Sequence, residues 1–403
     1  MSKNTYFTGQ PIFSQLLSLI PRSLITRNIF KHESDRYYKK FKSYDHLVSM
    51  LYACFEKCSS IREVTTGLMA CYSKLQHLGL KYVPRRSTLA EANQNRKEAF
   101  FADLYHSLYH HYFGFSPDSR LKGKVENRLF LIDSTTISLF TEVMKGMGTR
   151  AVDGRKKGGA KAHLLVKASE DVPCFVMITH ATKSDKEIFS EIKLPAGAIV
   201  VFDKGYNSYN QFIEWNRQKI TWVTRIVETA TQDVIEQKLV DLKEKQNGII
   251  ADDQVILGRP SNKKTKKIKV RRIKYHDKTT NRIFTFITNN NRFNPSTIAD
   301  IYKRRWQIEL LFKRLKQNYP LRYFLGESEN AIKIQIWASL ITDLLIKIIS
   351  QKVKRNWSFA NISGMIRLHL MNYIHIITFL NNPEETLKFY KVQEPELQLR
   401  LYT

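Results

Sequence analysis

The chain has few cysteines, no long apolar run and a shortage of acidic residues. Its four cysteines, Cys54, Cys58, Cys71 and Cys174, are too few and too irregularly spaced for a disulfide framework. Cys54 and Cys58 are spaced as on one helix face, yet no nearby histidine completes a zinc-binding set. We interpret the cysteines as small core residues in a reducing compartment.

No apolar run is long enough to span a membrane, and the first fifteen residues, MSKNTYFTGQPIFSQ, lack the pattern of a signal peptide. The two most apolar segments, 333–354 and 358–380, are interrupted by charged or titratable side chains such as Asp343 and Arg367. No membrane partner is therefore expected, and the cytoplasm is the expected location.

The abundant feature is positive charge. Sixty-five basic residues against thirty-seven acidic ones give the chain of 403 residues a net charge of +28 and a pI near 9.8. A charge this unequal favours a polyanionic partner, with nucleic acid the first candidate and a membrane surface the rival. The length predicts two or three domains with a large core.

Residues 1–120 are predicted to form a helical, DNA-binding domain. Apolar residues recur at spacings of three and four, and Ser60 and Ser87 are candidate helix caps. The segment after Pro84 predicts a short helix rich in amide and basic side chains: Asn93, Gln94, Asn95, Arg96 and Lys97. Such a helix can read DNA in a helix-turn-helix arrangement, but an ordinary helical bundle with a polar face is the alternative.

Residues 121–226 change to a pattern of strands. The run RLFLIDST predicts a buried strand ending in Asp133, and GAIVVFDKG predicts another ending in Asp203. Between these two strands, 161–169 and 172–181 predict a hairpin. After Asp203, 208–218 predicts a helix and 220–226 predicts a strand. The order predicts a mixed α/β sheet, and open α/β sheets place their sites at the carboxyl ends of strands.

Residues 227–293 predict a short helix followed by a β-rich insertion with a basic rim. The rim is either a solvated surface hairpin or a phosphate-binding surface, and the density of cations favours the second. The cations are Lys263, Lys264, Lys266, Lys267, Lys269, Arg271, Arg272 and Lys274.

Residues 294–320 predict one helix, beginning at Asn294 and Pro295 and stopping at Pro320. Four polar residues fall within roughly 60° of one face at about 100° per residue: Tyr302, Arg305, Glu309 and Lys316. Trp306 and Lys313 flank them. Taken alone, Glu309 can equally form ion pairs along a solvated face.

The last regions are assigned as 294–355, the polar helix and a long apolar helix expected to cover the sheet, and 356–403, a helical region with a possible role in dimerisation.

Three acidic residues have the contexts that a metal site for phosphodiester chemistry requires: Asp133, Asp203 and Glu309. The two aspartates lie at predicted strand ends, and the glutamate lies on the predicted helix. Hard divalent ions prefer oxygen ligands such as these. The rival carboxylates Asp153, Asp185 and Asp343 fall in a loop, at a helix start and in an apolar helix.

The chain resembles the DDE transposases of the bacterial insertion-sequence-four family. That family has the signature Y-(2)-R-(3)-E-(6)-K, and Tyr302, Arg305, Glu309 and Lys316 fit every spacing. LIDST and VVFDKGYNS resemble the first and second aspartate motifs of the family. The resemblance covers about residues 125–350.

The resemblance implies a ribonuclease-H-like fold, with Asp133, Asp203 and Glu309 as ligands of two Mg²⁺ ions, which Mn²⁺ can replace. It implies that Tyr302, Arg305 and Lys316 contact DNA phosphates. Trp306 either stacks on an unpaired base or packs in the core.

The implied activity is cut-and-paste transposition. Terminal inverted repeats are bound, the element ends are cleaved, and the 3′-hydroxyl ends are joined to target DNA. The implied partners are double-stranded DNA and a second copy of the chain in a synaptic complex, close to the bacterial nucleoid. A metal-dependent nuclease of the same fold and a catalytically silent DNA-binding regulator are the alternatives.

Overall fold

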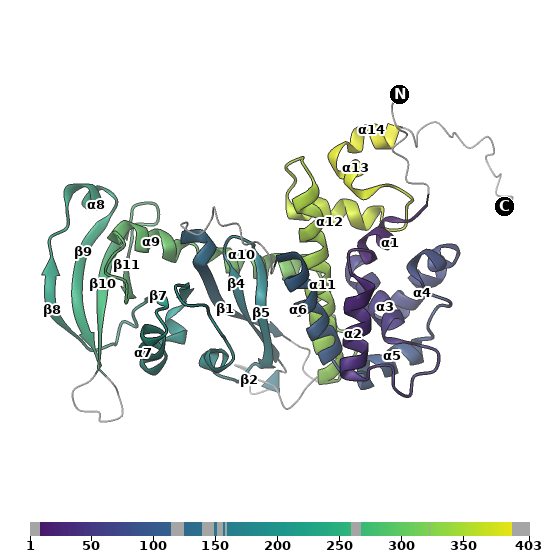
Figure 1. Ribbon diagram of the computed structural model, residues 1–403, viewed down its shortest axis with the longest axis horizontal. Coiled ribbons are helices and arrows are strands. Elements are labelled where there is room, and N and C mark those ends of the chain that lie inside the picture. The colour runs from purple at the N-terminus through teal and green to yellow at the C-terminus, as the bar shows by residue number, and fades with distance from the viewer. Residues whose placement is uncertain are drawn as a thin grey trace. The chain divides into compact units, whose positions relative to one another are not determined.

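The computed structural model describes residues 9–113, 125–138, 149–150, 156–157, 159–258, 267–321 and 323–388 (Figure 1). The contacts within the chain divide it into two compact units. One unit comprises residues 1–114 and 314–403, and the other comprises residues 115–313. We call the first the helical unit and the second the sheet unit.

The sheet unit is organised around nine strands in the order β5-β4-β1-β6-β7-β11-β10-β9-β8. The first three strands in this order are β5 (Val172–His180), β4 (Gly159–Lys167) and β1 (Leu129–Ser138), and each pairs antiparallel with its neighbour. β6 (Ile199–Phe202) and β7 (Thr221–Arg225) then continue parallel to β1. This mixture of antiparallel and parallel pairing is the ribonuclease-H-like arrangement, which confirms the predicted fold class.

The β-rich segment continues the same sheet. β11 (Arg282–Thr288) pairs antiparallel with β7, and β10 (Ile268–Asp277), β9 (Ile249–Leu257) and β8 (Gln232–Lys238) follow outward. The helix expected around 234–245 is therefore wrong in its first half, because pairing with β9 holds that stretch as an edge strand. Only α8 (Leu242–Gln246) is helical there. A small separate ladder joins β2 (Thr149–Arg150) to β3 (Lys156–Lys157).

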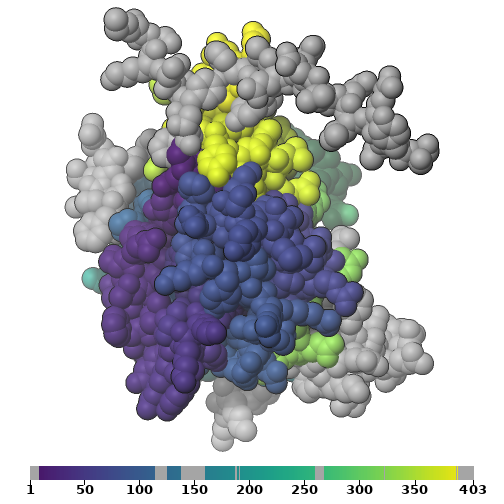
Figure 2. Space-filling model, turned by 90° about the vertical axis from the view of Figure 1, so that its right-hand side faces the viewer, coloured from purple at the N-terminus to yellow at the C-terminus, as the bar shows by residue number. Residues whose placement is uncertain are grey.

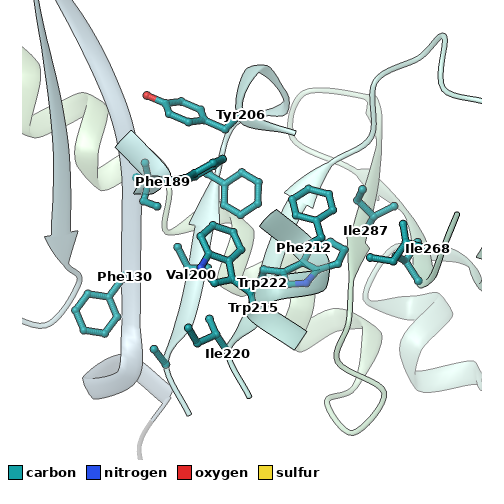
Figure 3. Packing of buried hydrophobic residues seen from close by; sticks show 14 of the residues in the cluster. Phe130, Phe189, Val200, Tyr206, Phe212, Trp215, Ile220, Trp222, Ile268 and Ile287 are labelled. Carbon is teal, nitrogen blue, oxygen red and sulfur yellow. The ribbon is translucent and has the colours of Figure 1, made fainter. Parts of the chain in front are cut away.

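A cluster of buried aromatic rings fixes β6 and β7 in the sheet (Figure 3). Phe212 of α7 (Tyr209–Arg217) stacks on Trp222 of β7 with ring centroids 4.1 Å apart. The Trp222 indole N–H donates to Asn216 Oδ1 at 3.0 Å, so its one polar atom is satisfied. Tyr206, in the short helix η5 (Lys204–Tyr206), turns its hydroxyl away from the other rings (Figure 3). The segments that follow β6 and β7 are therefore anchored by a packed core.

The helical unit contains ten α-helices in its described residues. The first six are α1 (Ile12–Leu17), α2 (Arg22–His32), α3 (Ser43–Phe55), α4 (Ile61–Ala70), α5 (Arg86–Asn95) and α6 (Ala99–Phe113). The last four are α11 (Glu329–Lys352), α12 (Phe359–Leu368), α13 (Ile376–Asn381) and α14 (Pro383–Lys388). Figure 2 shows the N-terminal helices in purple and blue beside the C-terminal segments in yellow.

The long helix α11 is buried along most of its length and packs mainly against α3 and α6, with further contacts to α5 and α12. The main packing partners of α11 are therefore the N-terminal helices, whereas the sequence predicted that this helix covers the sheet. The expected single helix at 358–380 is wrong, since α12 ends at Leu368 and α13 begins only at Ile376. No helix in the described ranges is long and apolar enough to cross a membrane.

Two predictions about the N-terminal helices have different outcomes. Ser60 caps α4, because its hydroxyl accepts the backbone N–H of Glu63 at 3.2 Å. Ser87 caps nothing, since α5 begins one residue earlier, at Arg86. Two of the five side chains proposed to read bases, Asn93 and Arg96, are buried, which rules them out for that role.

Candidate active site

The helix that carries the acidic residue Glu309 is broken at Arg304 and Arg305. The structure has α9 (Pro295–Lys303) and α10 (Trp306–Asn318), with a turn between them in which the Arg305 N–H donates to the Tyr302 carbonyl at 3.0 Å. The prediction of one continuous helix is thus wrong at this point. Asn294 occupies the cap position without a side-chain bond, and the N–H and hydroxyl of Ser296 donate instead to the Glu244 carboxylate.

Asp133 and Asp203 follow the same rung of two paired parallel strands. The pairing of β1 with β6 ends at Ile132 and Phe202, and the two aspartates are the next residue on each strand. β1 itself continues to Ser138 against β4, so Asp133 lies mid-strand rather than at the strand end that the sequence predicted. The carboxylates nevertheless stand beside each other at the edge where β1 and β6 part.

Arg305 links the first aspartate to the glutamate. Its Nη1 atom lies 3.1 Å from Asp133 Oδ2, and its Nη2 atom lies 2.6 Å from Glu309 Oε1. The second Asp133 oxygen accepts the Ser134 backbone N–H at 2.8 Å. One guanidinium therefore partly neutralises two of the three carboxylates.

Asp203 is held by two residues of its own. Arg225, the last residue of β7, donates from Nη2 to Asp203 Oδ1 at 3.1 Å, and the Tyr302 hydroxyl lies 3.5 Å from the same oxygen. The Tyr302 ring is buried against Phe286 and lies 5.9 Å from the Arg225 guanidinium carbon and 5.8 Å from that of Arg305. The tyrosine thus packs between the two arginines of the site.

The electrostatics of the two aspartates differ. Burial raises the pKa of Asp133 to about 6, and the nearby charges of Asp203 and Glu309 add to the rise. Burial also raises the pKa of Asp203, but the hydrogen bond and charge of Arg225 outweigh it, so this pKa lies below its ordinary value. At neutral pH, Asp203 holds its negative charge more firmly than Asp133.

The donor chemistry of the site suits a hard divalent cation, because all three side chains offer carboxylate oxygens. The Arg305 guanidinium now lies between Asp133 and Glu309, where a cation would be attracted. With that guanidinium in place, no three His, Cys, Asp or Glu side chains in the described part of the chain are grouped to hold a metal ion.

The other residues expected at the site are also placed. Trp306 is 59% exposed at the start of α10, which excludes the core-packing alternative for its ring. Lys313 is exposed on the same helix. Lys316 is exposed near the end of α10, in the part of that helix that belongs to the helical unit.

Two of the rival carboxylates are bound by other side chains, and the third lies outside the described ranges. Asp343 accepts from Arg314 at 2.9 Å and 3.1 Å and from the Tyr319 hydroxyl at 3.2 Å, all within the helical unit. Asp185 begins the short helix η4 (Asp185–Ser190) and accepts the Ser134 hydroxyl at 2.7 Å, with Lys161 Nζ 3.0 Å away. Asp153 is not among the described residues.

Arg225 was not predicted to belong to the site, although its position in the sequence indicates it. A charged residue that ends a buried strand next to the Asp203 strand marks the same edge of the sheet. The sequence also led to a wrong prediction for two cations of the β-rich segment. Arg271 and Arg272 are buried and ion-paired with Asp252 and Asp253, so they are structural rather than part of a phosphate-binding rim.

Comparison with known proteins identifies the family of the chain. Residues 125–344 match the family model of the transposase DDE domain, and residues 8–81 match a domain of unknown function (DUF4372). The chain is 32% identical over 267 residues to a protein described as a transposase, y4zB, from Sinorhizobium fredii, covering 66% of this chain and 71% of that one. It is 26% identical over 271 residues, 65% of this chain and 71% of the other, to a protein described as a transposase for insertion sequence element IS4SA from Synechocystis.

Among solved structures, the piggyBac transposase synaptic complex with hairpin DNA aligns with a TM-score of 0.45 and 10% identity, over 96% of this chain and 81% of that chain. The family model covers more than half of the sequence, and the chain belongs to the transposase DDE-domain family. It is a transposase, an enzyme that cleaves DNA and transfers DNA strands. Domains of this family generally depend on divalent metal ions.

Proposed function

We propose that this transposase binds the terminal inverted repeats of its own insertion sequence, cleaves the DNA at the element ends and transfers the 3′-hydroxyl ends to target DNA. The observation that carries the proposal is the network that joins Asp133, Asp203 and Glu309 through Arg305, Arg225 and Tyr302. The spacing of Tyr302, Arg305, Glu309 and Lys316, which resembles the signature of the insertion-sequence-four family, supports the proposal.

Asp133, Asp203 and Glu309 are the proposed ligands of two Mg²⁺ ions, with Mn²⁺ as a substitute. When bound, such ions activate an attacking oxygen and stabilise the charge on a leaving oxygen. The rigid strands β1 and β6 fix the two aspartates, while α10 supplies the glutamate.

The cations of the site are proposed to hold the DNA backbone. Arg305 is positioned to exchange its carboxylate partners for the scissile phosphate, which a guanidinium binds through two parallel hydrogen bonds. Tyr302 and Lys316 are the further proposed phosphate contacts. The exposed ring of Trp306 is available to stack on an unpaired base near the cut.

The proposal extends to the organisation of the complex. Residues 1–120 are the proposed DNA-binding domain, and 356–403 a proposed dimerisation region of a homodimer that brings two element ends together. Its place is the bacterial cytoplasm, at the nucleoid. The proposed catalytic domain consists of 121–226 and 294–355 with 227–293 inserted.

The test uses the DNA on either side of the gene and the purified chain. Short inverted repeats flanking the coding region, bordered by a direct duplication, define the element ends. With Mg²⁺, the chain should nick a labelled fragment of such an end and join it to a second duplex. Cleavage without joining would favour a nuclease of the same fold and count against the proposal.

A further inference from the structure

The second part of the loop between α2 and α3, residues 36–42, presents positive charge that the active site does not use. Its sequence, RYYKKFK, contains four cations; Glu33 and Asp35 precede it in the same loop, and Arg36 pairs with Glu33 at 2.8 Å. Lys39, Lys40 and Lys42 are exposed, and none of them forms an ion pair with a residue that the structure describes. Solvated lysines are common on surfaces, so charge alone does not give the loop a function.

The second observation is the aromatic side chain at the tip. Tyr37 is 88% exposed, although a large ring normally gains by burial. Its φ of +68° lies in the left-handed region, which a bulky residue adopts at a cost of about 1 kcal/mol or more. Tyr37 thus combines an exposed ring with a left-handed backbone, and its ring contacts the Arg36 guanidinium, whose carbon lies 5.1 Å from the ring centre.

The third observation is how the loop is held. Arg96, 1% exposed, donates from its two terminal nitrogens to the carbonyl oxygens of Phe41 at 2.8 Å and Lys42 at 3.0 Å. Its guanidinium carbon lies 4.3 Å from the centre of the Tyr38 ring. Burying an arginine is unfavourable unless its charge and hydrogen bonds are compensated. Here the compensation comes from the loop itself, so the loop and the buried arginine fix each other.

The base of the loop is closed by further hydrogen bonds. Asp35 Oδ1 accepts the Ser43 N–H at 2.6 Å, and the Ser43 hydroxyl donates to that of Ser34 at 2.7 Å. The lysines are therefore displayed from a preorganised backbone. Preorganisation matters for binding, because less conformational freedom is lost when the partner arrives.

We infer that the 36–42 loop is a DNA-contacting surface, in which Lys39, Lys40 and Lys42 bind phosphates of duplex DNA and Tyr37 packs on a sugar or base edge. Arg96 is its positioning residue. The inference rests on the proposed function for the identity of the partner. It moves the DNA contact of the N-terminal helices away from the amide-rich α5, part of which is buried.

The test measures binding of the full chain to a labelled duplex of about 30 base pairs over a series of salt concentrations. The variant Lys39→Gln, Lys40→Gln, Lys42→Gln should bind about tenfold more weakly or worse, with a salt slope smaller by about two to three. The matched control, Lys352→Gln, Lys354→Gln, Lys388→Gln, removes the same charge from exposed lysines of the same unit and should behave like the wild type.

A second variant separates the ring from the charges. Tyr37→Gly should weaken binding about fivefold or more with an unchanged salt slope, because it removes no cation. Its melting temperature should not fall, since glycine accepts the left-handed backbone freely.

Two failures can be told apart. If the wild-type chain binds the duplex with no salt dependence, the DNA partner of the proposed function is wrong. If the wild type binds with a steep salt dependence and the lysine variant keeps both affinity and slope, the assignment of the loop alone is overturned.

Discussion

Arg225 Nη2 lies 3.1 Å from Asp203 Oδ1, and this ion pair joins the ends of two adjacent parallel strands, β6 and β7. The pair lowers the pKa of Asp203 against the effect of burial. Arg225 thereby keeps one carboxylate of the site ionised in a crowded acidic environment.

Replacing Arg225 with glutamine should raise the pKa of Asp203, because burial and the neighbouring carboxylates are then unopposed. The acidic limb of the pH profile of DNA cleavage should move to higher pH, while Arg225→Lys should recover part of the change. Arg217→Gln, which removes an exposed arginine on α7, is the matched control. An unaltered pH profile in Arg225→Gln would remove Arg225 from the site.

The raised pKa of Asp133 predicts that this residue affects the stability of the fold in a pH-dependent way. Its folded pKa of about 6 lies above the ordinary value of 3.8, so the folded state binds the proton more tightly. Ionised Asp133 therefore costs stability, a cost that appears as pH rises from about 4 through about 6. Without metal at pH 7.5, Asp133→Asn should unfold with a free energy higher by on the order of 1–3 kcal/mol. Denaturant titrations should show the gain vanishing near pH 4, and a gain that persists there would contradict the pKa.

Arg305 should compete with divalent cations for Asp133 and Glu309. In Arg305→Gln the carboxylates lose their shared cation, so the metal-free protein should melt lower and gain more from added Mg²⁺. We expect the Mg²⁺-induced rise in melting temperature to exceed that of the wild type by about 2–4 °C. Arg304→Gln, the exposed neighbour that pairs with Glu126, should respond as the wild type does. Equal gains in all three proteins would show that Arg305 does not shield the site.

Replacing Arg271 should lower the stability of the fold and leave DNA binding by the folded chain unchanged. Its buried ion pair with Asp252 has a nitrogen–oxygen distance of 2.7 Å, and removing one partner leaves a buried charge. Arg271→Gln should lower the free energy of unfolding by about 3 kcal/mol. Lys269→Gln, at an exposed position of the same strand, should change it by less than about 0.5 kcal/mol. If Arg271→Gln folds as stably as the wild type but binds DNA more weakly, Arg271 belongs to the DNA-binding surface after all.

The strand pattern and signature spacings in the sequence were enough to predict the fold class and that Asp133, Asp203, Arg305 and Glu309 lie together, although Asp133 lies mid-strand. The break between α9 and α10 was out of reach, because no glycine or proline marks it. In the turn, the Arg305 N–H donates to the Tyr302 carbonyl, and the Arg305 side chain binds both Glu309, four residues on, and Asp133, which is distant in the sequence. Ile308, Leu311 and Leu315 of α10, spaced by three and four residues, are buried, as expected for one face of a helix.

Other misreadings share a cause. Arg271 and Arg272 are predicted from the sequence to belong to a phosphate-binding rim, and only the register of β10 on β9 places Asp252 and Asp253 beside them. The stretch 232–238 has helical spacing, but an available strand edge outweighs so weak a propensity. Long-range pairing decides such cases, and a single sequence does not record it.

The most direct test of the three-carboxylate site compares Asp133→Asn, Asp203→Asn and Glu309→Gln with Asp300→Asn, an exposed acidic residue on α9. Each protein is given Mg²⁺ and a labelled element end, and both binding and cleavage are measured. The three site variants should bind the DNA but cleave it at least on the order of a hundredfold more slowly, while Asp300→Asn should cleave normally. Full cleavage by any one of the three would contradict the site.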